Sequence, residues 1–304
     1  MFRKILGCLL GVCLLGFGVT ACAQEQADTE EWYPPSAGPV TTWTSPVCGK
    51  GELYVQPFFF YNNTRGTFDD DGHSDSLPEG DRQNQFQEQF FFQYGLTNRL
   101  EVAGQMVYQQ NYLRQDNESA HAKGLGDTYA YLRYCLLEEK KALPHITGIF
   151  QLKIPTAKFQ KAGEDKLGID IMGDGSYDPG YGVILTKRIK PFILHADAIY
   201  SIPTTRKVDG VKTLNGKYVT ADVGVEYFFF KNFNLMLEGN FFSQGDIRAD
   251  GELTPASDSA SVVISPGIGW SNEKIQCLLA YQRVVLGTNT NANDSVLATF
   301  VYGF

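Results

Sequence analysis

Apolar and polar residues alternate with a period of two along most of the chain after residue 52. In residues 100–108, for example, one face carries Leu100, Val102, Met106 and Tyr108, whereas the other carries Glu101, Ala103 and Gln105. This period is typical of β-strands whose two faces meet different surroundings. The pattern predicts an all-β chain.

Twelve segments carry this alternation or the aromatic-rich runs that accompany it. They are residues 53–61, 85–96, 99–110, 124–137, 143–155, 179–186, 191–202, 217–230, 233–244, 259–270, 274–286 and 295–304. Most are at or above the roughly 9–11 residues that a tilted strand needs to cross a bilayer. Twelve membrane-crossing strands are therefore expected.

The connections between these segments alternate between short and long. Short turns are expected at 97–98, 138–141, 187–190, 231–232 and 271–273, and long polar loops at 62–84, 111–123, 156–178, 203–216, 245–258 and 287–294. Outer-membrane barrels have this asymmetry, with short periplasmic turns and long extracellular loops. We predict a transmembrane antiparallel β-barrel of about 12 strands over residues 51–304, with both termini on the periplasmic side. The alternative is a secreted lipocalin-like barrel or β-sandwich, which would need a polar outer face.

The N-terminus predicts export. Residues 1–23 combine a basic start, an apolar run and small residues, as in a secretory signal peptide. Two processing routes stay open, cleavage after Ala23 or acylation at Cys22, and we favour cleavage. Residues 24–50, rich in Pro and Trp, are expected to form an irregular periplasmic segment. No apolar run suits a membrane-spanning helix, so the predicted location is the bacterial outer membrane.

The last strand ends on an aromatic residue. Val296, Phe300, Tyr302 and Phe304 lie on one face of it. This resembles the terminal strand of bacterial outer-membrane barrels, whose final aromatic residue is part of the signal that the assembly machinery reads. We expect Phe304 to be that signal, and outer-membrane lipids, lipopolysaccharide and the assembly machinery to be partners.

Composition excludes several other classes of protein. Without Arg3 and Lys4, 24 basic residues stand against 34 acidic ones, a net charge of −10, which argues against nucleic-acid binding. The cysteines are scattered without metal-binding spacing. Acidic loops at Asp69–Asp71 and around Asp170, Asp174 and Asp178 lack a complete calcium-loop pattern, so solvated carboxylates are favoured over a cation bridge to lipopolysaccharide. We expect no cofactor and no metal.

Strand parity predicts which ionisable side chains line the lumen. They are Glu101, Asp127, Arg133, His145, Lys153, Asp197, Asp222, Glu226 and Glu238. One interpretation is an acidic channel, because rings of carboxylates favour cations. The other is a lumen plugged by pairs of acids and bases, since twelve strands lie between the filled eight-strand barrel and the open porins.

Short motifs add a family resemblance. They are Gly124-Leu-Gly-Asp-Thr-Tyr-Ala-Tyr-Leu-Arg-Tyr134, Leu-Lys-Ile-Pro-Thr at 152–156 and Asp-Pro-Gly-Tyr-Gly at 178–182. Over residues 50–304 the chain resembles the outer-membrane barrel family named for the meta-cleavage pathway of phenol degradation. The resemblance implies a transporter-like protein linked to small aromatic or hydrophobic compounds, and it implies no catalytic residues.

The expected function is a passive channel or transporter for an unidentified small molecule. The rivals are a structural or adhesive surface barrel with a plugged lumen and a barrel hydrolase. For the hydrolase, His195, Asp197 and Ser201 share one strand face. At about 3.3 Å per residue, His195 and Ser201 lie far beyond the roughly 3 Å that a base and its nucleophile require. We therefore expect no enzyme.

Overall fold

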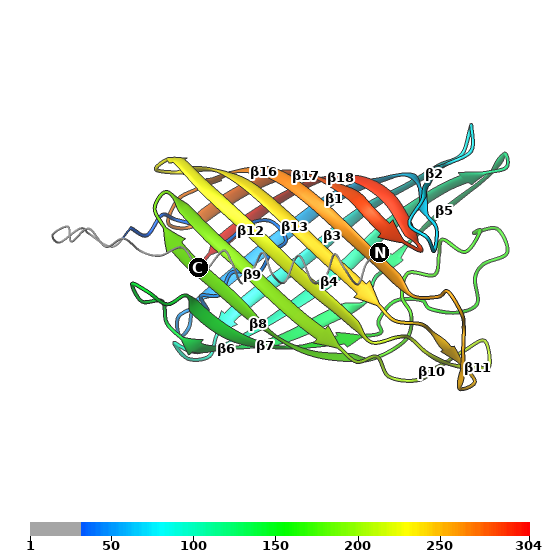
Figure 1. The fold of residues 1–304 in the computed structure, drawn as a ribbon, viewed down its shortest axis with the longest axis horizontal. Helices are drawn as coiled ribbons and strands as arrows, with labels where there is room; N and C mark the ends of the chain where they lie inside the picture. Colours follow the sequence, from blue (N-terminus) through cyan, green and yellow to red (C-terminus); the bar gives the residue numbers. More distant parts are fainter. Residues whose placement is uncertain (1–31) are drawn as a thin grey trace. The chain divides into compact units, whose positions relative to one another are not determined.

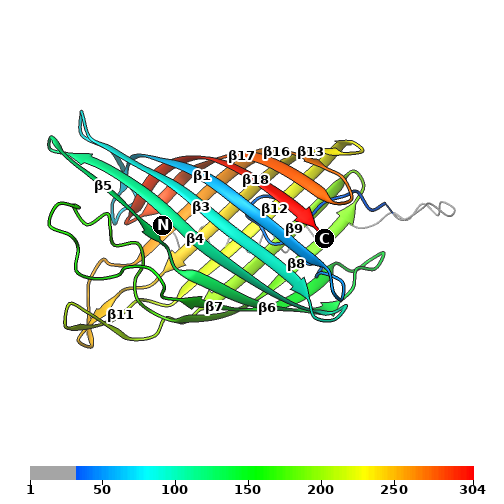
Figure 2. The same cartoon turned by 180° about the vertical axis from the view of Figure 1, so that it is seen from behind.

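We describe a computed structural model of the chain, which describes residues 32–304. The expected signal peptide, with Cys22 and Ala23, lies outside these residues. Residues 34–304 form a compact unit, which is a closed barrel of twelve antiparallel strands (Figures 1 and 2). None of the described residues forms a helix long and apolar enough to cross a membrane.

The barrel strands follow one another around the wall in chain order. They are β1 (Leu53–Phe68), β3 (Arg82–Gly95), β4 (Leu100–Gln115), β6 (Thr128–Leu137), β7 (His145–Ile154), β8 (Asp178–Ile189), β9 (Phe192–Ser201), β12 (Tyr218–Phe230), β13 (Phe233–Gln244), β16 (Ser259–Ser271), β17 (Ile275–Thr288) and β18 (Thr290–Gly303). The barrel closes where β1 pairs with β18, from Tyr54 opposite Gly303 to Phe68 opposite Thr290. Closure leaves no free edge within the membrane, as a lipid-embedded sheet requires.

Short strands extend the wall at the long-loop end. They are β2 (Ser74–Ser76), β5 (Glu118–Leu125), which pairs with β4, and the four-stranded group of β10 (Arg206–Val208), β11 (Val211–Leu214), β14 (Arg248–Ala249) and β15 (Glu252–Leu253). These hairpins lie opposite the end of the barrel that carries the short turns (Figure 1).

Five of the six expected long loops contain strands, since β10 and β11 lie within 203–216 and β14 and β15 within 245–258. The 287–294 loop is a tight connection at Asn289, because β17 runs to Thr288 and β18 starts at Thr290. Much of 62–84 and 111–123 is also strand. Beyond the membrane both faces of a strand meet water, so the alternation that marks strands in the sequence disappears there although the backbone pairing continues.

The facing of the wall follows the predicted parity. Leu237 and Leu279 are each 52% exposed on the outer surface. Inward positions hold buried polar groups and an internal apolar core. That core includes two clusters, one around Phe91, Tyr131, Ile149 and Ile184, the other around Met236, Leu278, Ala280 and Leu297.

Candidate functional site

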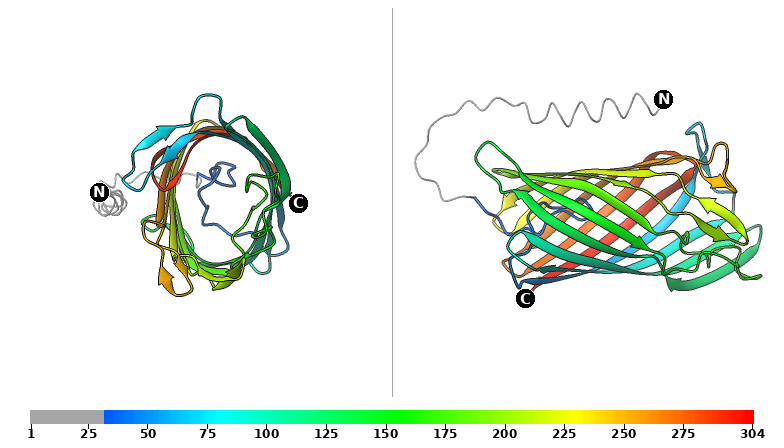
Figure 3. Two further views of the ribbon diagram at one scale, coloured as in Figure 1. Left: turned by 90° about the vertical axis from the view of Figure 1, so that its right-hand side faces the viewer. Right: turned by 90° about the horizontal axis from the view of Figure 1, so that it is seen from below.

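A segment of the chain occupies the inside of the barrel at the short-turn end. We call residues 35–48 the inner segment; it hydrogen-bonds to inward side chains of strands all around the wall and is visible inside the barrel in Figure 3. Residues 24–50 were expected to be a periplasmic segment. For the inner segment this is corrected, because its contacts lie within the wall.

The composition of the inner segment explains why it can lie there. It carries no charged side chain and contains Pro35, Pro39 and Pro46. Prolines interrupt regular pairing, so the segment keeps backbone N–H and C=O groups that need partners once buried. The inward carboxylates of the wall need donors for the same reason, and the two sets satisfy one another.

Glu238 on β13 accepts several hydrogen bonds from consecutive residues of the inner segment. Its carboxylate accepts hydrogen bonds from the backbone N–H groups of Val40, Thr41 and Thr42 at 3.0, 2.9 and 2.7 Å. The hydroxyls of Thr41 and Thr42 donate to the same carboxylate at 2.9 and 2.8 Å. Glu238 is 2% exposed, so these bonds replace its water shell.

A second anchor joins Arg133 on β6 to Glu101 on β4. Both are fully buried, and Arg133 Nη1 donates to Glu101 Oε1 at 2.7 Å. Arg133 Nη2 donates to the carbonyls of Thr44 and Pro46, while Glu101 Oε2 accepts the Cys48 N–H at 2.7 Å. Arg133 thus donates to backbone carbonyls of the inner segment, and Glu101 accepts from one of its backbone N–H groups.

Trp43 is the apolar anchor of the inner segment. The Arg133 guanidinium lies 5.1 Å from the centre of its ring, a cation–π distance. Its ring packs edge-on against Phe91 and Tyr131, with centroids 5.6 and 5.0 Å apart. The backbone N–H of Trp43 donates to Asp197 Oδ2 at 2.9 Å.

Histidines and further carboxylates complete the ring of contacts. Ser36 donates to Glu226 at 2.9 Å, and His195 Nε2 lies 3.0 Å from the same carboxylate. Ser45 Oγ lies 2.8 Å from His145 Nδ1. Six of the nine predicted lumen residues therefore hold the inner segment, either directly or through an ion pair: Glu101, Arg133, His145, Asp197, Glu226 and Glu238.

The remaining three predicted residues lie elsewhere. Asp222 on β12 is directly opposite Asp197 on β9. Lys153, at the long-loop end of β7, lies 2.6 Å from Asp178, 2.8 Å from Asp174 and 4.0 Å from Asp127. These contacts fix the loop 156–177 to the rim of the barrel, and Asn215 reinforces them by donating to Asp174 at 2.7 Å.

Sequence reasoning missed the neutral anchors. Gln276 accepts the Ala37 N–H at 2.7 Å and donates to the Gly38 carbonyl at 3.0 Å. Thr186 and Thr147 bond the backbone of Ser45 at 2.8 and 2.6 Å. Their inward parity can be read from the sequence, but these side chains carry no charge that would mark them as candidate site residues.

Aromatic rings and amides line the inside toward the long-loop end. Phe58 stacks on Phe60 with centroids 6.1 Å apart, and Tyr218 lies 5.8 Å from Phe242. All four side chains are partly exposed. Amide side chains join across neighbouring strands, as in the bond from Asn62 to Gln85 at 2.8 Å and those from Gln85 to Gln109 and Asn111 at 3.1 and 3.0 Å.

The residues considered for the rival hydrolase function, His195, Asp197 and Ser201, do not form a relay. Ser201 Oγ accepts from Gln151 at 3.2 Å, whereas His195 contacts Thr186 and Glu226. Ser45 does meet His145, but Ser45 is fully buried and the other nitrogen of the His145 ring faces Cys135 Sγ at 3.6 Å. Within residues 32–304, no group of three or more His, Cys, Asp or Glu side chains is arranged to hold a metal ion.

The fold is that of known outer-membrane barrels. An outer-membrane channel from Pseudomonas putida F1 is similar over 88% of this chain and 100% of that one, with a TM-score of 0.70 and 14% identity. The NanC porin is similar over 82% of this chain and 98% of its own, with a TM-score of 0.50 and 10% identity. At these identities the likeness concerns the fold.

Sequence comparison places the barrel in a family. No curated protein matches the chain. A family model described as "Putative MetA-pathway of phenol degradation" matches residues 95–300, which cover β4 through most of β18 and hence most of the wall. The chain therefore belongs to the family that this model describes.

Proposed function

We propose that the protein is a passive outer-membrane channel for small apolar or aromatic molecules, and that the inner segment is its closed gate. The observation that carries the proposal is the position of the inner segment. This neutral stretch of chain lies inside the barrel at the short-turn end, held by non-covalent contacts to the inward side chains of the wall. Its displacement would break these contacts and none of the pairing between strands of the wall.

The lining of the long-loop half supports the choice of solute. Partly exposed rings at Phe58, Phe60, Tyr218 and Phe242 offer faces for an aromatic solute. The neighbouring amides are neutral and offer hydrogen bonds to a polar substituent of an uncharged molecule. Membership of a family described by phenol degradation points to the same class of compound.

Conductance in planar bilayers tests the gate. Deleting residues 35–48 should give openings that the complete chain lacks or shows rarely. Glu238→Gln should act in the same direction but less strongly, because an amide keeps one acceptor and places an NH2 group against backbone N–H donors. Glu88→Gln is the matched control, since Glu88 is exposed and lies on the outward face of β3.

The rival function is a structural or adhesive barrel whose lumen stays closed, and the inner segment inside the short-turn end is compatible with it. The same recordings separate the two. If the folded deletion variant conducts no ions and admits no phenol into loaded vesicles, the gate proposal fails and the structural role is preferred.

A further inference from the structure

Cations gather on the outer face of β3, β4 and β5 at the long-loop end. Strand parity places four residues of each strand on this face: Arg82, Asn84, Phe86, Glu88, Tyr108, Gln110, Tyr112, Arg114, Ser119, His121, Lys123 and Leu125. Three of these are cations and one is a carboxylate. Below them, toward the short turns, the same face is apolar, with Phe90 and Met106 exposed.

Two of the cations directly oppose each other. Arg82 on β3 and Arg114 on β4 are register partners, and both are exposed. Like charges directly opposite on neighbouring strands destabilise a sheet. Among the described residues, no ion pair or side-chain hydrogen bond joins either guanidinium, or the ammonium of Lys123, to a carboxylate. A bound anion would relieve this repulsion.

The position of the cations along the strands indicates which anion they would bind. Two residues along a strand span about 7 Å. Glu88, Tyr108 and Leu125 lie side by side on the three strands, and Lys123 is two residues closer to the long-loop end. The pair of Arg82 and Arg114 is a further four residues beyond Lys123 in the same direction.

Exposed apolar and aromatic side chains on this face end at Phe86, Tyr112 and Leu125, and aromatic rings mark the membrane interfaces of such barrels. We therefore expect the arginine pair to lie at the level of the lipid headgroups. In outer-membrane barrels the long-loop end faces the cell exterior, where the headgroups carry phosphate.

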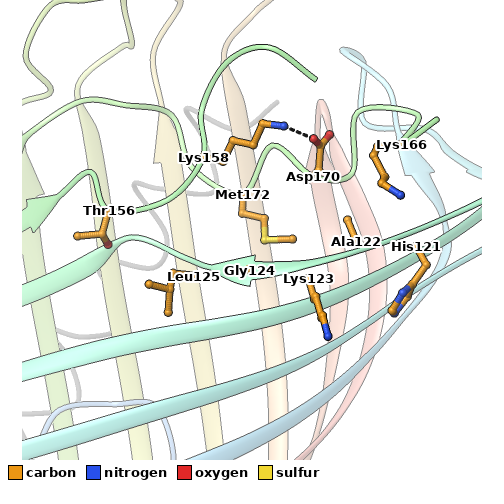
Figure 4. A pocket seen from close by; sticks show the side chains of 10 residues that line it. All are labelled: His121, Ala122, Lys123, Gly124, Leu125, Thr156, Lys158, Lys166, Asp170 and Met172. Atoms are coloured by element: carbon orange, nitrogen blue, oxygen red, sulfur yellow. Dashed lines mark hydrogen bonds and ion pairs between the residues drawn. The ribbon is translucent and has the colours of Figure 1, made fainter. Parts of the chain in front are cut away.

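A pocket adjoins this face. It has a volume of about 600 Å3 and lies between β5 and the loop 156–177 (Figure 4). Its cations include Lys158 and Lys166, which pair with Asp170 and Asp165, so these two are neutralised. Lys123 and His121 leave β5 on the same side, and Lys123 remains available for an anion.

We propose that this face binds the phosphate groups of lipid A, the phosphorylated glycolipid anchor of lipopolysaccharide, with Arg82 and Arg114 as the main ligands and Lys123 as a third. Planar guanidinium groups hold phosphate through paired hydrogen bonds. The acyl chains would then lie along Phe86, Tyr108 and Leu125. The site is independent of the proposed channel function.

Lipid titration of the purified barrel in detergent, followed by native mass spectrometry, tests the site. Arg82→Gln/Arg114→Gln should weaken lipid A binding about a hundredfold, on the basis of roughly tenfold for each charge-assisted contact. Dephosphorylated lipid A should bind the unaltered barrel as weakly as lipid A binds the arginine variant. Because the substitution removes a repulsive pair, the variant should fold in lipid-free detergent at least as well as the parent chain.

The control is Lys207→Gln/Lys212→Gln. These lysines are also exposed register partners at the long-loop end, but they belong to the β10–β11 hairpin rather than to the lipid-facing wall. Lipid A binding should be unchanged in this variant. Equal loss in both variants, or undiminished binding in the arginine variant, would overturn the site. Displacement of lipid A by millimolar inorganic phosphate would reassign it to free phosphate.

Discussion

At the residue scale, the side of the wall that a side chain faces decides what it contacts. Leu237 and Glu238 are neighbours on β13, yet Leu237 is 52% exposed on the outer surface and Glu238 is buried against the inner segment. The same polypeptide therefore meets lipid and a hydrogen-bonded interior at successive positions.

Substitution of outward leucines tests this facing. Leu237→Arg should destabilise the folded barrel by about 2–4 kcal/mol, the cost of Arg on the lipid face near the midplane, and Leu136→Arg near the end of its strand by about 0–1 kcal/mol. Leu136 is 57% exposed, so the pair is matched in residue type and exposure. Refolding titrations in lipid vesicles measure both values. Equal losses of folding free energy in the two variants would show that the membrane depths assigned to Leu237 and Leu136 are wrong.

At the element scale, the loop 156–177 depends on one lysine. Burial raises the pKa of Asp174, but the hydrogen bond and charge of Lys153 outweigh it and hold the pKa below its usual value. A lowered carboxylate pKa gives stability that is present above the unfolded pKa of about 3.9 and is lost as the pH falls through the folded value. The loop should thus remain anchored at neutral and mildly acidic pH.

Hydrogen exchange of this loop measures the anchor. Lys153→Met should raise exchange in residues 156–177 at pH 7, because it leaves three carboxylates without their shared cation. The unaltered chain should reach comparable exchange, corrected for the intrinsic rate, only below about pH 4. Lys166→Met, which removes an exposed pair with Asp165, should change little. Similar protection in both variants at pH 7 would remove Lys153 from this role.

At the scale of the whole molecule, the barrel closes through its last strand. The backbone N–H of Phe304 donates to Leu53 at 2.9 Å, and its ring, 72% exposed, lies 4.7 Å from that of Tyr302. The ring adds little to the folded structure. Its expected role is therefore recognition during assembly.

Comparison of assembly in cells with refolding in vitro separates those roles. Phe304→Asp should lower the heat-modifiable population in the outer membrane, while refolding of the purified variant into vesicles stays close to that of the parent. Phe230→Asp is the control, because Phe230 is 68% exposed near a short turn. Normal assembly of the Phe304 variant in cells would contradict the signal role.

The sequence by itself determined the barrel, its strand number and the facing of its wall. Alternation is a local property, and lipid outside with a polar interior imposes it on every membrane-crossing strand. It therefore identified Glu101, Arg133 and Glu238 as inward residues. It failed for the extent of β17 and β18 beyond the membrane, where water on both faces erases the pattern.

Only the tertiary structure decided what those inward residues bind. Val40 and Glu238 are 198 positions apart, and the inner segment has no periodicity that could predict its partner. Its contacts run largely through backbone N–H and C=O groups, which every residue type carries and which the side-chain pattern does not report. The carboxylates predicted to line a channel are, for this reason, the anchors of a segment that lies inside the barrel.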